Sequence, residues 1–289
     1  MLSIGLVGAG QWAWRGHAPA LCADPGIRFA GVWARRPSSA EGLAARFGTT
    51  AYASLPELLE ACEAVAFAVP PGVQAELGLV AAKAGRPVLL DKPLAADVAG
   101  AARLADAIGE AGLPSQLLLT LRYTTAVRAF LTCAAQIAAF GGHAAWVSGG
   151  ALEGPSATMW RREQGPILDL GPHVIDLMDA ALGPVTAVRA HGAGGGWTGI
   201  LLEHEGGAVS EVSLCHRARL QDPVCWFRVY GRQGAAAVDR PRVGPDAWAA
   251  LTREFCQTVR DGGGHPLDVR HGLRLQRILE AASSELRRE

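Results

Sequence analysis

Residues 1–119 alternate between short apolar segments and longer segments with helical spacing. Near-continuous apolar runs predict strands at 2–7, 27–33, 64–69, 87–90 and 117–121. Alanine-rich segments between them predict helices at 38–47, 55–62, 73–84 and 96–111. Strands that are apolar on both faces and alternate with helices indicate a parallel sheet with both faces covered. We therefore expect residues 1–119 to form an α/β domain.

The pattern changes in residues 120–289, where strands follow one another with few helices between them. A helix is predicted at 124–138, a strand at 144–152 and an apolar, partly helical segment at 166–182. Further strands are predicted at 185–191, 198–205, 208–217 and 224–231, and closing helices at 246–261 and 268–287. Consecutive strands joined by short glycine-containing turns indicate an open, mainly antiparallel sheet in an α+β domain.

One of these strands carries large side chains on both faces. Alternation places Cys225, Phe227 and Val229 on one face and Trp226, Arg228 and Tyr230 on the other. A second face with Trp and Tyr is too apolar for open water, so it predicts a subunit interface, the alternative being isolated aromatic exposure.

Composition and charge exclude several classes of protein. Of the 289 residues, 49% are hydrophobic and 19% charged, as in a globular chain of two domains. Lys+Arg and Asp+Glu both total 27, so no basic surplus favours nucleic acid or anionic lipid. No apolar run approaches the ~18 residues of a membrane span. The N-terminus lacks a signal-peptide pattern and the six cysteines form no C-x-x-C pair, so we expect a cytoplasmic protein without a metal site.

A glycine turn follows the first predicted strand. Gly8-Ala9-Gly10-Gln11-Trp12-Ala13 fits G-x-G-x-x-A, a relaxed form of the dinucleotide-binding fingerprint. Such a turn also occurs for packing alone, but its place between a strand and a helix favours binding of a pyrophosphate at the helix N-terminus. We expect Gly8, Gly10, Gln11 and Trp12 to contact a dinucleotide in a Rossmann-type domain.

The end of the second predicted strand bears on which dinucleotide binds. NAD sites normally place a carboxylate there for the ribose 2′-hydroxyl, whereas NADP sites place an arginine near the 2′-phosphate. Here the sequence is Ala34-Arg35-Arg36-Pro37-Ser38, with no acidic residue before Glu41. Arginine binds phosphate in a bidentate manner. We therefore expect Ala34, Arg35, Arg36 and Ser38 to favour NADP(H) over NAD(H), the alternative being a solvated pair of arginines.

Lysine is rare in this chain, which draws attention to where it occurs. Of the 27 basic residues only Lys83 and Lys92 are lysine. Lys92 follows the fourth predicted strand in Asp91-Lys92-Pro93, at the sheet edge where ligands bind in open α/β folds. A lysine there is a candidate for chemistry, because its pKa shifts readily on burial.

A second candidate lies in the segment Gly165–Asp176. Asp169 and His173 are four residues apart, so they would share a helix face, although Pro172 leaves open whether a helix begins near Gly171 or a longer one is kinked. A carboxylate beside an imidazole fixes its tautomer and raises its basicity, as a general acid–base requires. A purely structural histidine is the alternative.

Together these motifs resemble the glucose–fructose oxidoreductase / inositol dehydrogenase (Gfo/Idh/MocA) family. In order along the chain, the matching positions are the glycine turn, Val69-Pro70-Pro71, Asp91-Lys92-Pro93, Arg122-Tyr123, Trp160-Arg161 and Asp169…His173. Several positions depart from the usual family pattern: Asp91 replaces Glu, Ala13 replaces the third Gly of the turn, Glu163-Gln164 replace two of three glycines, and Gln74 stands where many members have His.

The resemblance implies an NAD(P)H-dependent oxidoreductase that transfers hydride to or from a carbonyl or hydroxyl carbon of a small, sugar-like substrate. It implies that Lys92 and His173 flank the reacting carbon with Asp169 in support, and that Val69, Pro70, Asp91 and Lys92 join the cofactor site. Leaning on the resemblance, we also expect the Lys92–Pro93 peptide bond in this turn to be cis, since a cis bond costs only ~0.5–1 kcal/mol before proline. Arg122, Tyr123, Trp160 and Arg161 become candidates for the substrate pocket. The resemblance also implies a homodimer or homotetramer built through the second domain's sheet.

Other reactions of the same fold stay open at this point. They are a cofactor-retaining lyase or glycoside hydrolase, an imine reductase, and a non-catalytic ligand sensor. The sensor predicts loss of the lysine or the histidine, and both are present here.

Overall fold

The computed structural model describes residues 1–152, 165–193 and 196–287. The chain forms two compact units, one of Met1–Leu118 with Gly244–Arg274 and one of Leu119–Val243 with Leu275–Glu289. The chain thus leaves the first unit after Leu118 and returns to it at Gly244. The sequence-based division into 1–119 and 120–289 places the first crossing at nearly the same position but contains no such return.

The first unit contains a five-stranded sheet, sheet A, with the order β2-β1-β3-β4-β5. Every pairing in it is parallel, as the sequence predicts. Its strands are β1 (Leu2–Val7), β2 (Ile27–Trp33), β3 (Ala64–Phe67), β4 (Val88–Leu90) and β5 (Ser115–Leu117). Most of their side chains are buried, which explains why the strands read as apolar runs rather than as alternating ones.

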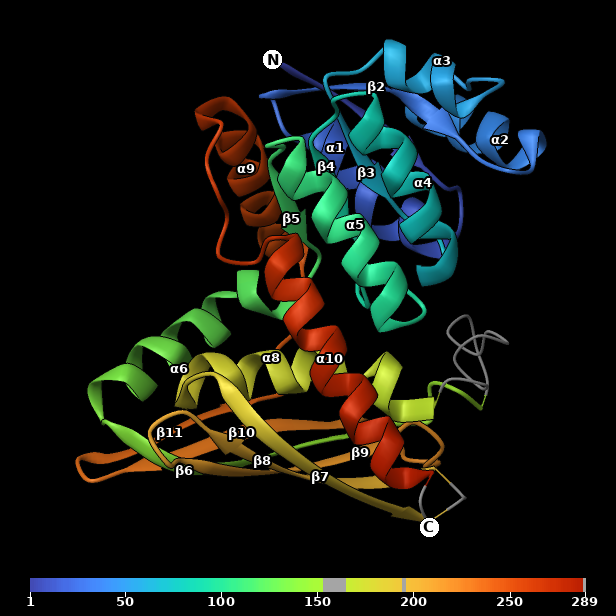
Figure 1. Cartoon of the computed structure of the whole chain (residues 1–289). Coiled ribbons are helices and arrows are strands. Elements are labelled where there is room, and N and C mark those ends of the chain that lie inside the picture. The colour runs from blue at the N-terminus through green and yellow to red at the C-terminus, as the bar shows by residue number, and fades with distance from the viewer. Residues whose placement is uncertain (153–164, 194–195, 288–289) are drawn as a thin grey trace. The chain divides into compact units, whose positions relative to one another are not determined.

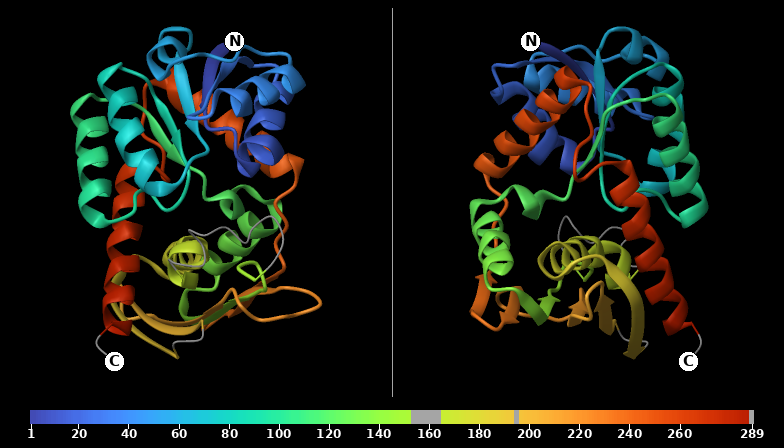
Figure 2. Two further views of the ribbon diagram at one scale, coloured as in Figure 1. Left: turned by 90° about the vertical axis from the view of Figure 1, so that its right-hand side faces the viewer. Right: turned by 60° about the vertical axis from the view of Figure 1, so that its left-hand side comes forward.

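Helices cover both faces of sheet A. They are η1 (Ala13–His17), α1 (Ala18–Ala23), α2 (Pro37–Phe47), α3 (Leu55–Glu60), α4 (Pro71–Lys83), α5 (Val98–Glu110) and α9 (Pro245–Asp261). Figures 1 and 2 show α4 and α5 together on one face, and α1 with α9 on the other. The α/β prediction for this region is therefore confirmed.

The fifth strand lies earlier than the sequence pattern predicts. It spans Ser115–Leu117 rather than 117–121, and residues Thr120–Tyr123 form a short 3-10 helix, η2. Both polar residues of the strand are buried because the returning segment supplies their partners. Gln116 donates its amide to the carbonyl of Leu251 at 3.1 Å, and the Ser115 hydroxyl accepts the amide N–H of Val269 at 3.1 Å. The local apolar pattern could not predict these partners, because they lie far away in the sequence.

The second unit contains a six-stranded sheet, sheet B, with the order β11-β10-β6-β9-β8-β7. It is mainly antiparallel, as predicted, and only β6 and β9 pair in parallel. Its strands are β6 (Ala139–Val147), β7 (Val185–Ala193), β8 (Trp197–His204), β9 (Val209–Cys215), β10 (Val224–Gly231) and β11 (Gly234–Asp239).

Two strands of sheet B correct the sequence-based prediction. β6 begins at Ala139 and ends at Val147, several residues before the predicted 144–152, and β11 was not predicted. The early part of β6 contains Gly141 and Gly142, which resemble a turn in sequence. In the structure, a Cβ atom at Gly142 would lie 2.4 Å from the carbonyl oxygen of Arg228, so glycine here permits close approach of β10.

Helices lie on one face of sheet B. α6 (Thr125–Gln136) and α8 (Gly171–Leu182) cover that face, and Leu279 of α10 (Val269–Leu286) lies against the start of α8, since a Cβ atom at Gly171 would lie 2.9 Å from it. In Figures 1 and 2 no helix of the described chain covers the opposite face. We call that opposite side the open face of sheet B.

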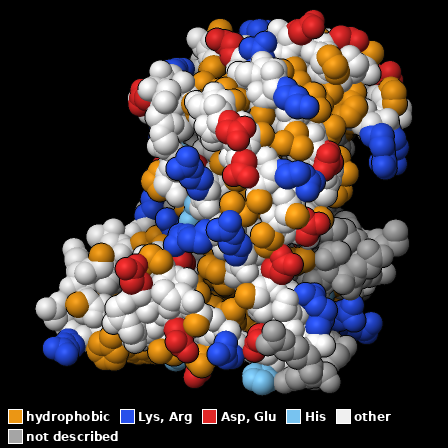
Figure 3. Space-filling view, in the orientation of Figure 1, with side chains coloured by type: hydrophobic (Ala, Val, Ile, Leu, Met, Phe, Trp, Pro, Cys, Tyr) orange, Lys and Arg blue, Asp and Glu red, His pale blue; other side chains and the backbone are white. Residues whose placement is uncertain are grey.

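Across the described residues, no helix combines the length and apolar character that a membrane span requires. Figure 3 shows acidic and basic side chains interspersed over the face that it draws.

Candidate active site

The glycine turn joins β1 to the first helix by a backbone path that only glycine can take. Gly8 has a φ of 109°, and its N–H donates to the carbonyl of Trp33 at 2.8 Å. A Cβ atom at this position would lie 2.4 Å from the carbonyl oxygen of Ala68 and 2.9 Å from Val69. The structure therefore brings Val69, a predicted cofactor contact after β3, against the glycine turn.

Gly10, by contrast, faces open space. It is exposed, and a Cβ atom there would meet no protein atom within 4 Å. The helix begins directly after it, since the N–H of Trp14 donates to the Gly10 carbonyl at 3.1 Å. Helix N-terminal amides beside an unobstructed backbone fit the pyrophosphate of a dinucleotide. Of the other predicted contacts here, Gln11 is half-buried and Trp12 is 42% exposed.

The helix after the turn has a π-helical segment, Ala13–His17, that the sequence did not predict. Trp248 from α9 packs against it, and a Cβ atom at Gly16 would lie 2.2 Å from that indole ring. The Trp248 ring also lies 6.2 Å from the Trp12 ring and 5.3 Å from the His17 ring, between ring centres. Burial lowers the pKa of His17 to about 4, so this imidazole is neutral at pH 7. Trp248 of the returning segment therefore packs against the helix that follows the glycine turn.

The end of β2 presents positive charge to solvent. Arg35 and Arg36 are exposed, as is Ser38 in the first turn of α2, and Ala34 is half-buried. Arg36 is the N-cap residue of α2 and Pro37 its first helical residue, with no acidic residue in the first turn. Two guanidinium groups beside a helix N-terminus form an arrangement that suits an added phosphate.

A buried glutamine holds the Asp91–Leu94 turn. The Gln74 amide nitrogen donates to the carbonyls of Asp91 at 2.8 Å and Leu94 at 3.0 Å, and its oxygen accepts the Asp91 N–H at 2.7 Å. The Lys92 N–H donates to the Asp91 carboxylate at 2.8 Å. The Lys92–Pro93 peptide bond is cis, as predicted. Gln74 thus fixes the backbone that carries Lys92, a role that sequence reasoning missed.

Replacing Gln74 by methionine tests this role. The variant keeps the side-chain length but removes three hydrogen bonds from a residue with no exposed surface. Because each buried polar group left unsatisfied costs roughly 1–3 kcal/mol, we expect the free energy of unfolding to fall by about 2–5 kcal/mol, measured by denaturant unfolding. Gln257→Met is the matched control, since the Gln257 amide bonds only Asp261 on the exposed surface of α9. Equal stability of the two variants would contradict the role.

In the second unit, α8 carries His173 in its first turn. α8 begins at Gly171, directly after a helical segment at 165–169 and a turn at Leu170. Asp169 and His173 therefore lie on two helical segments and not on one continuous helix. Both residues are buried, with 7% and 8% of their surface exposed. The His173 ring lies 5.6 Å from the ring of Trp146 on β6, between ring centres. The joint action of Asp169 and His173 stays a prediction.

The predicted substrate residues differ in their surroundings. Arg122 forms an ion pair with the buried carboxylate of Asp176 at 3.4 Å, and Tyr123 is only 3% exposed, with the Arg128 guanidinium 5.9 Å from its ring centre. Contact of Arg122 and Tyr123 with substrate stays a prediction. Trp160 and Arg161 lie outside the described residues.

Comparison with protein-family models gives matches over most of the chain. Residues 2–117 match the family described as "Oxidoreductase family, NAD-binding Rossmann fold", and residues 136–237 match the "GFO/IDH/MocA C-terminal domain".

Three similar proteins illustrate the relationship. A dTDP-3,4-didehydro-2,6-dideoxy-alpha-D-glucose 3-reductase of Saccharopolyspora spinosa is 29% identical over 266 residues, which cover 86% of this chain and 78% of the relative. Among solved structures, a levoglucosan dehydrogenase in complex with NADH and L-sorbose has a TM-score of 0.90 at 18% identity, covering 99% of this chain and 97% of its own. A UDP-N-acetylglucosamine 3-dehydrogenase of Acidithiobacillus ferrooxidans has a TM-score of 0.86 at 21% identity, with coverages of 99% and 97%.

Proposed function

The chain belongs to the Gfo/Idh/MocA family of NAD(P)-dependent oxidoreductases, and from this premise we propose that it reduces a ketone on a hexose ring linked to a nucleoside diphosphate. The observation that supports an oxidoreductase is the glycine turn, because Gly8 tolerates no side chain and Gly10 leaves space for the pyrophosphate of a dinucleotide. The S. spinosa relative, named for a dTDP-linked sugar, supports the substrate class.

The residues of this chain take separate roles in that reaction. When bound, the nicotinamide supplies the hydride that adds to the carbonyl carbon. His173 donates a proton to the carbonyl oxygen as the hydroxyl forms, and Asp169 orients the imidazole. Lys92 stabilises negative charge on the same oxygen, and Gln74 holds the Lys92 backbone in place. In the oxidative direction His173 takes the proton back.

Spectrophotometry tests the proposed activity directly. The purified protein is mixed with NADPH and, in separate reactions, with a dTDP-linked ketohexose, the corresponding free ketohexose and an imine. We expect stoichiometric loss of absorbance at the nicotinamide band with the dTDP-linked sugar. Product formation without net NADPH loss would indicate a cofactor-retaining lyase or glycoside hydrolase instead.

We further propose that the cofactor is NADP(H) rather than NAD(H). The support is the exposed pair Arg35 and Arg36 at the start of α2, with no acidic residue in its first turn. Arg35→Ala and Arg36→Ala should each weaken NADPH binding about 10- to 100-fold while changing NADH binding by less than about threefold, since a hydrogen bond to a charged group contributes ~1.5–3 kcal/mol. Calorimetry measures both affinities. Tighter binding of NADH than NADPH by the unaltered protein would contradict the preference.

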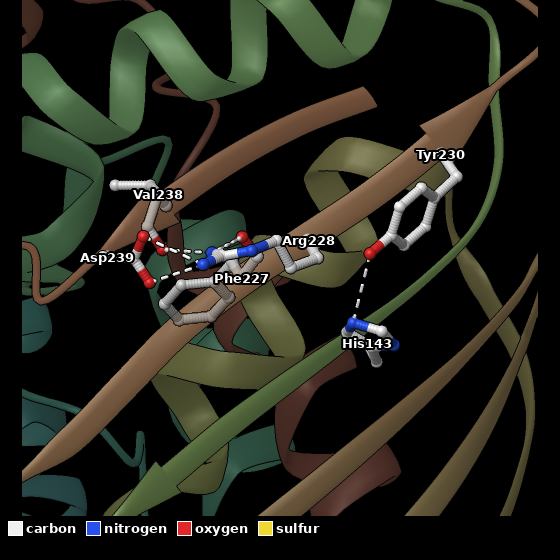
Figure 4. Close-up of polar contacts among 6 residues, drawn as sticks. All are labelled: His143, Phe227, Arg228, Tyr230, Val238 and Asp239. Carbon is white, nitrogen blue, oxygen red and sulfur yellow. Dashed lines mark hydrogen bonds and ion pairs between the residues drawn. The ribbon is translucent and has the colours of Figure 1, made fainter. Parts of the chain in front are cut away.

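We also propose that the open face of sheet B binds a second copy of this chain. Exposed apolar side chains from three strands share this face: Trp197 and Leu201 on β8, Val209 on β9 and Tyr230 on β10. As Figure 4 shows, Arg228 binds Asp239 at 2.7 and 2.9 Å, and the Tyr230 hydroxyl lies 3.4 Å from His143. Polar groups arranged before association lower its entropic cost.

Light scattering at micromolar concentration tests this interface. The unaltered chain should be a dimer or tetramer, and Leu201→Arg should yield monomers because it places a charge among apolar side chains. Leu220→Arg is the control, since Leu220 is similarly exposed but lies in the loop before β10. A monomeric unaltered chain would rule the interface out.

A cytoplasmic location of the protein stays a prediction from sequence.

A further inference from the structure

A pocket of about 280 Å³ lies in the second unit where β6 ends and β10 begins. Trp146, Pro223 and Cys225 supply the apolar part of its lining, and Asp222, Arg240 and Arg242, the last two directly after β11, supply the charged part. Burial raises the pKa of Cys225 to about 12, so its thiol adds no negative charge. The pocket therefore combines an aromatic side chain with two arginines and one carboxylate, that of Asp222, so its lining keeps a net positive charge.

This pocket adjoins the residue proposed as proton donor. Trp146 and Cys225 are paired across β6 and β10 and lie on the helix-covered face of sheet B. Trp146 lines the pocket, and its ring lies 5.6 Å from the His173 ring, between ring centres. A ligand that occupies the pocket therefore lies one side chain away from His173, which suits a part of the substrate remote from its reacting carbon.

Arg240 is held in an unusual backbone conformation. Its φ is 43°, in the left-handed region that residues other than glycine rarely adopt, and its N–H donates to the Cys225 carbonyl at 2.7 Å. Backbone conformations of this kind gather at ligand sites more often than elsewhere. The Arg240 guanidinium pairs with Asp222 at 3.2 Å, but these side chains are 51% and 69% exposed. Such an exposed pair is weak, so the guanidinium can exchange its carboxylate for a ligand anion.

We propose that this pocket binds the nucleoside diphosphate part of the substrate, with Arg240 and Arg242 at the phosphate oxygens and the base against Trp146. The inference rests on the proposed reduction of a nucleotide-linked sugar. Arginine binds phosphate oxygens in a bidentate manner, and indole offers a face on which a planar base stacks. Free phosphate or a sugar phosphate would use the arginines but leave the apolar part of the lining without a partner.

Calorimetric titration with dTDP tests the pocket. NADPH is present at saturation, so that the dinucleotide site cannot bind dTDP. We expect the unaltered protein to bind dTDP, and Arg240→Gly and Arg242→Gln each to weaken it about 10- to 100-fold. Glycine at position 240 suits the left-handed backbone, so the substitution adds no backbone strain. Arg232→Gln is the matched control, because Arg232 lies at the opposite end of the β10–β11 hairpin and should retain binding.

Further ligands and kinetics separate the outcomes. Thymidine, inorganic phosphate and glucose 6-phosphate should bind much more weakly than dTDP, and equal binding of glucose 6-phosphate would overturn the nucleotide assignment. With a nucleotide-linked sugar, the two variants should raise KM with little change in kcat. Absence of dTDP binding in a protein that reduces the dTDP-linked ketohexose overturns the pocket alone. Binding of dTDP that depends on Arg240, in a protein without hydride transfer, supports the pocket and overturns the proposed function.

Discussion

His173→Ala should lower kcat by about 10²- to 10⁴-fold, the usual contribution of a positioned general acid. The imidazole is buried in the first turn of α8 beside Trp146, so a water molecule could not simply take its place with the same orientation. The affinity for NADPH should stay nearly unchanged, because the residues proposed to contact the dinucleotide lie in the first unit. Stopped-flow or steady-state kinetics gives kcat, and fluorescence titration gives the affinity.

A structural histidine provides the control for this variant. His204 is equally buried, with its ring nitrogens 2.7 Å from the Gly183 carbonyl and 2.8 Å from the Ser210 hydroxyl. His204→Gln should lower stability while the kcat of the folded fraction changes little. If His173→Ala keeps kcat within severalfold of the unaltered enzyme, His173 is not the donor and Lys92 or Tyr123 becomes the next candidate.

Two further variants separate charge from proton chemistry. Asp169→Asn should lower kcat chiefly by changing the orientation and basicity of the His173 imidazole. Lys92→Arg keeps the positive charge but changes shape and proton affinity. Loss of activity in Lys92→Arg would show that charge alone is insufficient, whereas full activity would limit Lys92 to an electrostatic role.

Gly8→Ala should lower the stability of the protein, whereas Gly10→Ala should lower its affinity for the cofactor. At Gly8 the new methyl group would lie 2.4 Å from a backbone oxygen at a φ of 109°, so the free energy of unfolding should fall by about 3 kcal/mol or more even without cofactor. At Gly10 the methyl group meets no protein atom within 4 Å, so stability without cofactor should change by less than about 0.5 kcal/mol.

For the affinity of the protein for its cofactor, the Gly10→Ala substitution is the informative one of the two. If the pyrophosphate lies against the Gly10 backbone, the Gly10→Ala methyl group occupies that space, and affinity should fall on the order of 100-fold. Thermal unfolding with and without NADPH measures both effects in one experiment. A Gly10→Ala protein that NADPH stabilises as strongly as the unaltered chain would place the pyrophosphate elsewhere.

The parts of this fold that depend on residues close together in sequence could be predicted from the local pattern of apolar and polar residues. Apolar runs locate β1 and β2 at their observed bounds, and the alternation in β10 identifies its buried face. The cis Lys92–Pro93 bond was predicted with the help of the family resemblance rather than from local pattern alone. The glycine turn was recognisable because the backbone at Gly8 leaves no room for a side chain, so glycine must stand there.

The parts that were missed depend on distant partners. Gln116 and Ser115 look unsuited to a buried strand until the carbonyl of Leu251 and the N–H of Val269 are supplied. Trp248 gave no signal of its role because its contact, Gly16, lies at the other end of the chain. Gln74 was noticed only as a departure from a family pattern, and its three hydrogen bonds depend on a turn beyond the next strand.

The return of the chain at Gly244 has a consequence for how the protein is made. β5 is the edge strand of sheet A, and its Leu117 N–H donates to the Leu267 carbonyl at 2.7 Å. During synthesis on the ribosome, all five strands of sheet A emerge long before Leu267 does, so β5 stays an uncovered edge while the Leu119–Val243 part of the second unit is translated. Uncovered edges pair with other chains. A nascent chain arrested before residue 244 should therefore bind chaperones and aggregate, whereas one arrested with residue 274 outside the exit tunnel should resist proteolysis in its first unit.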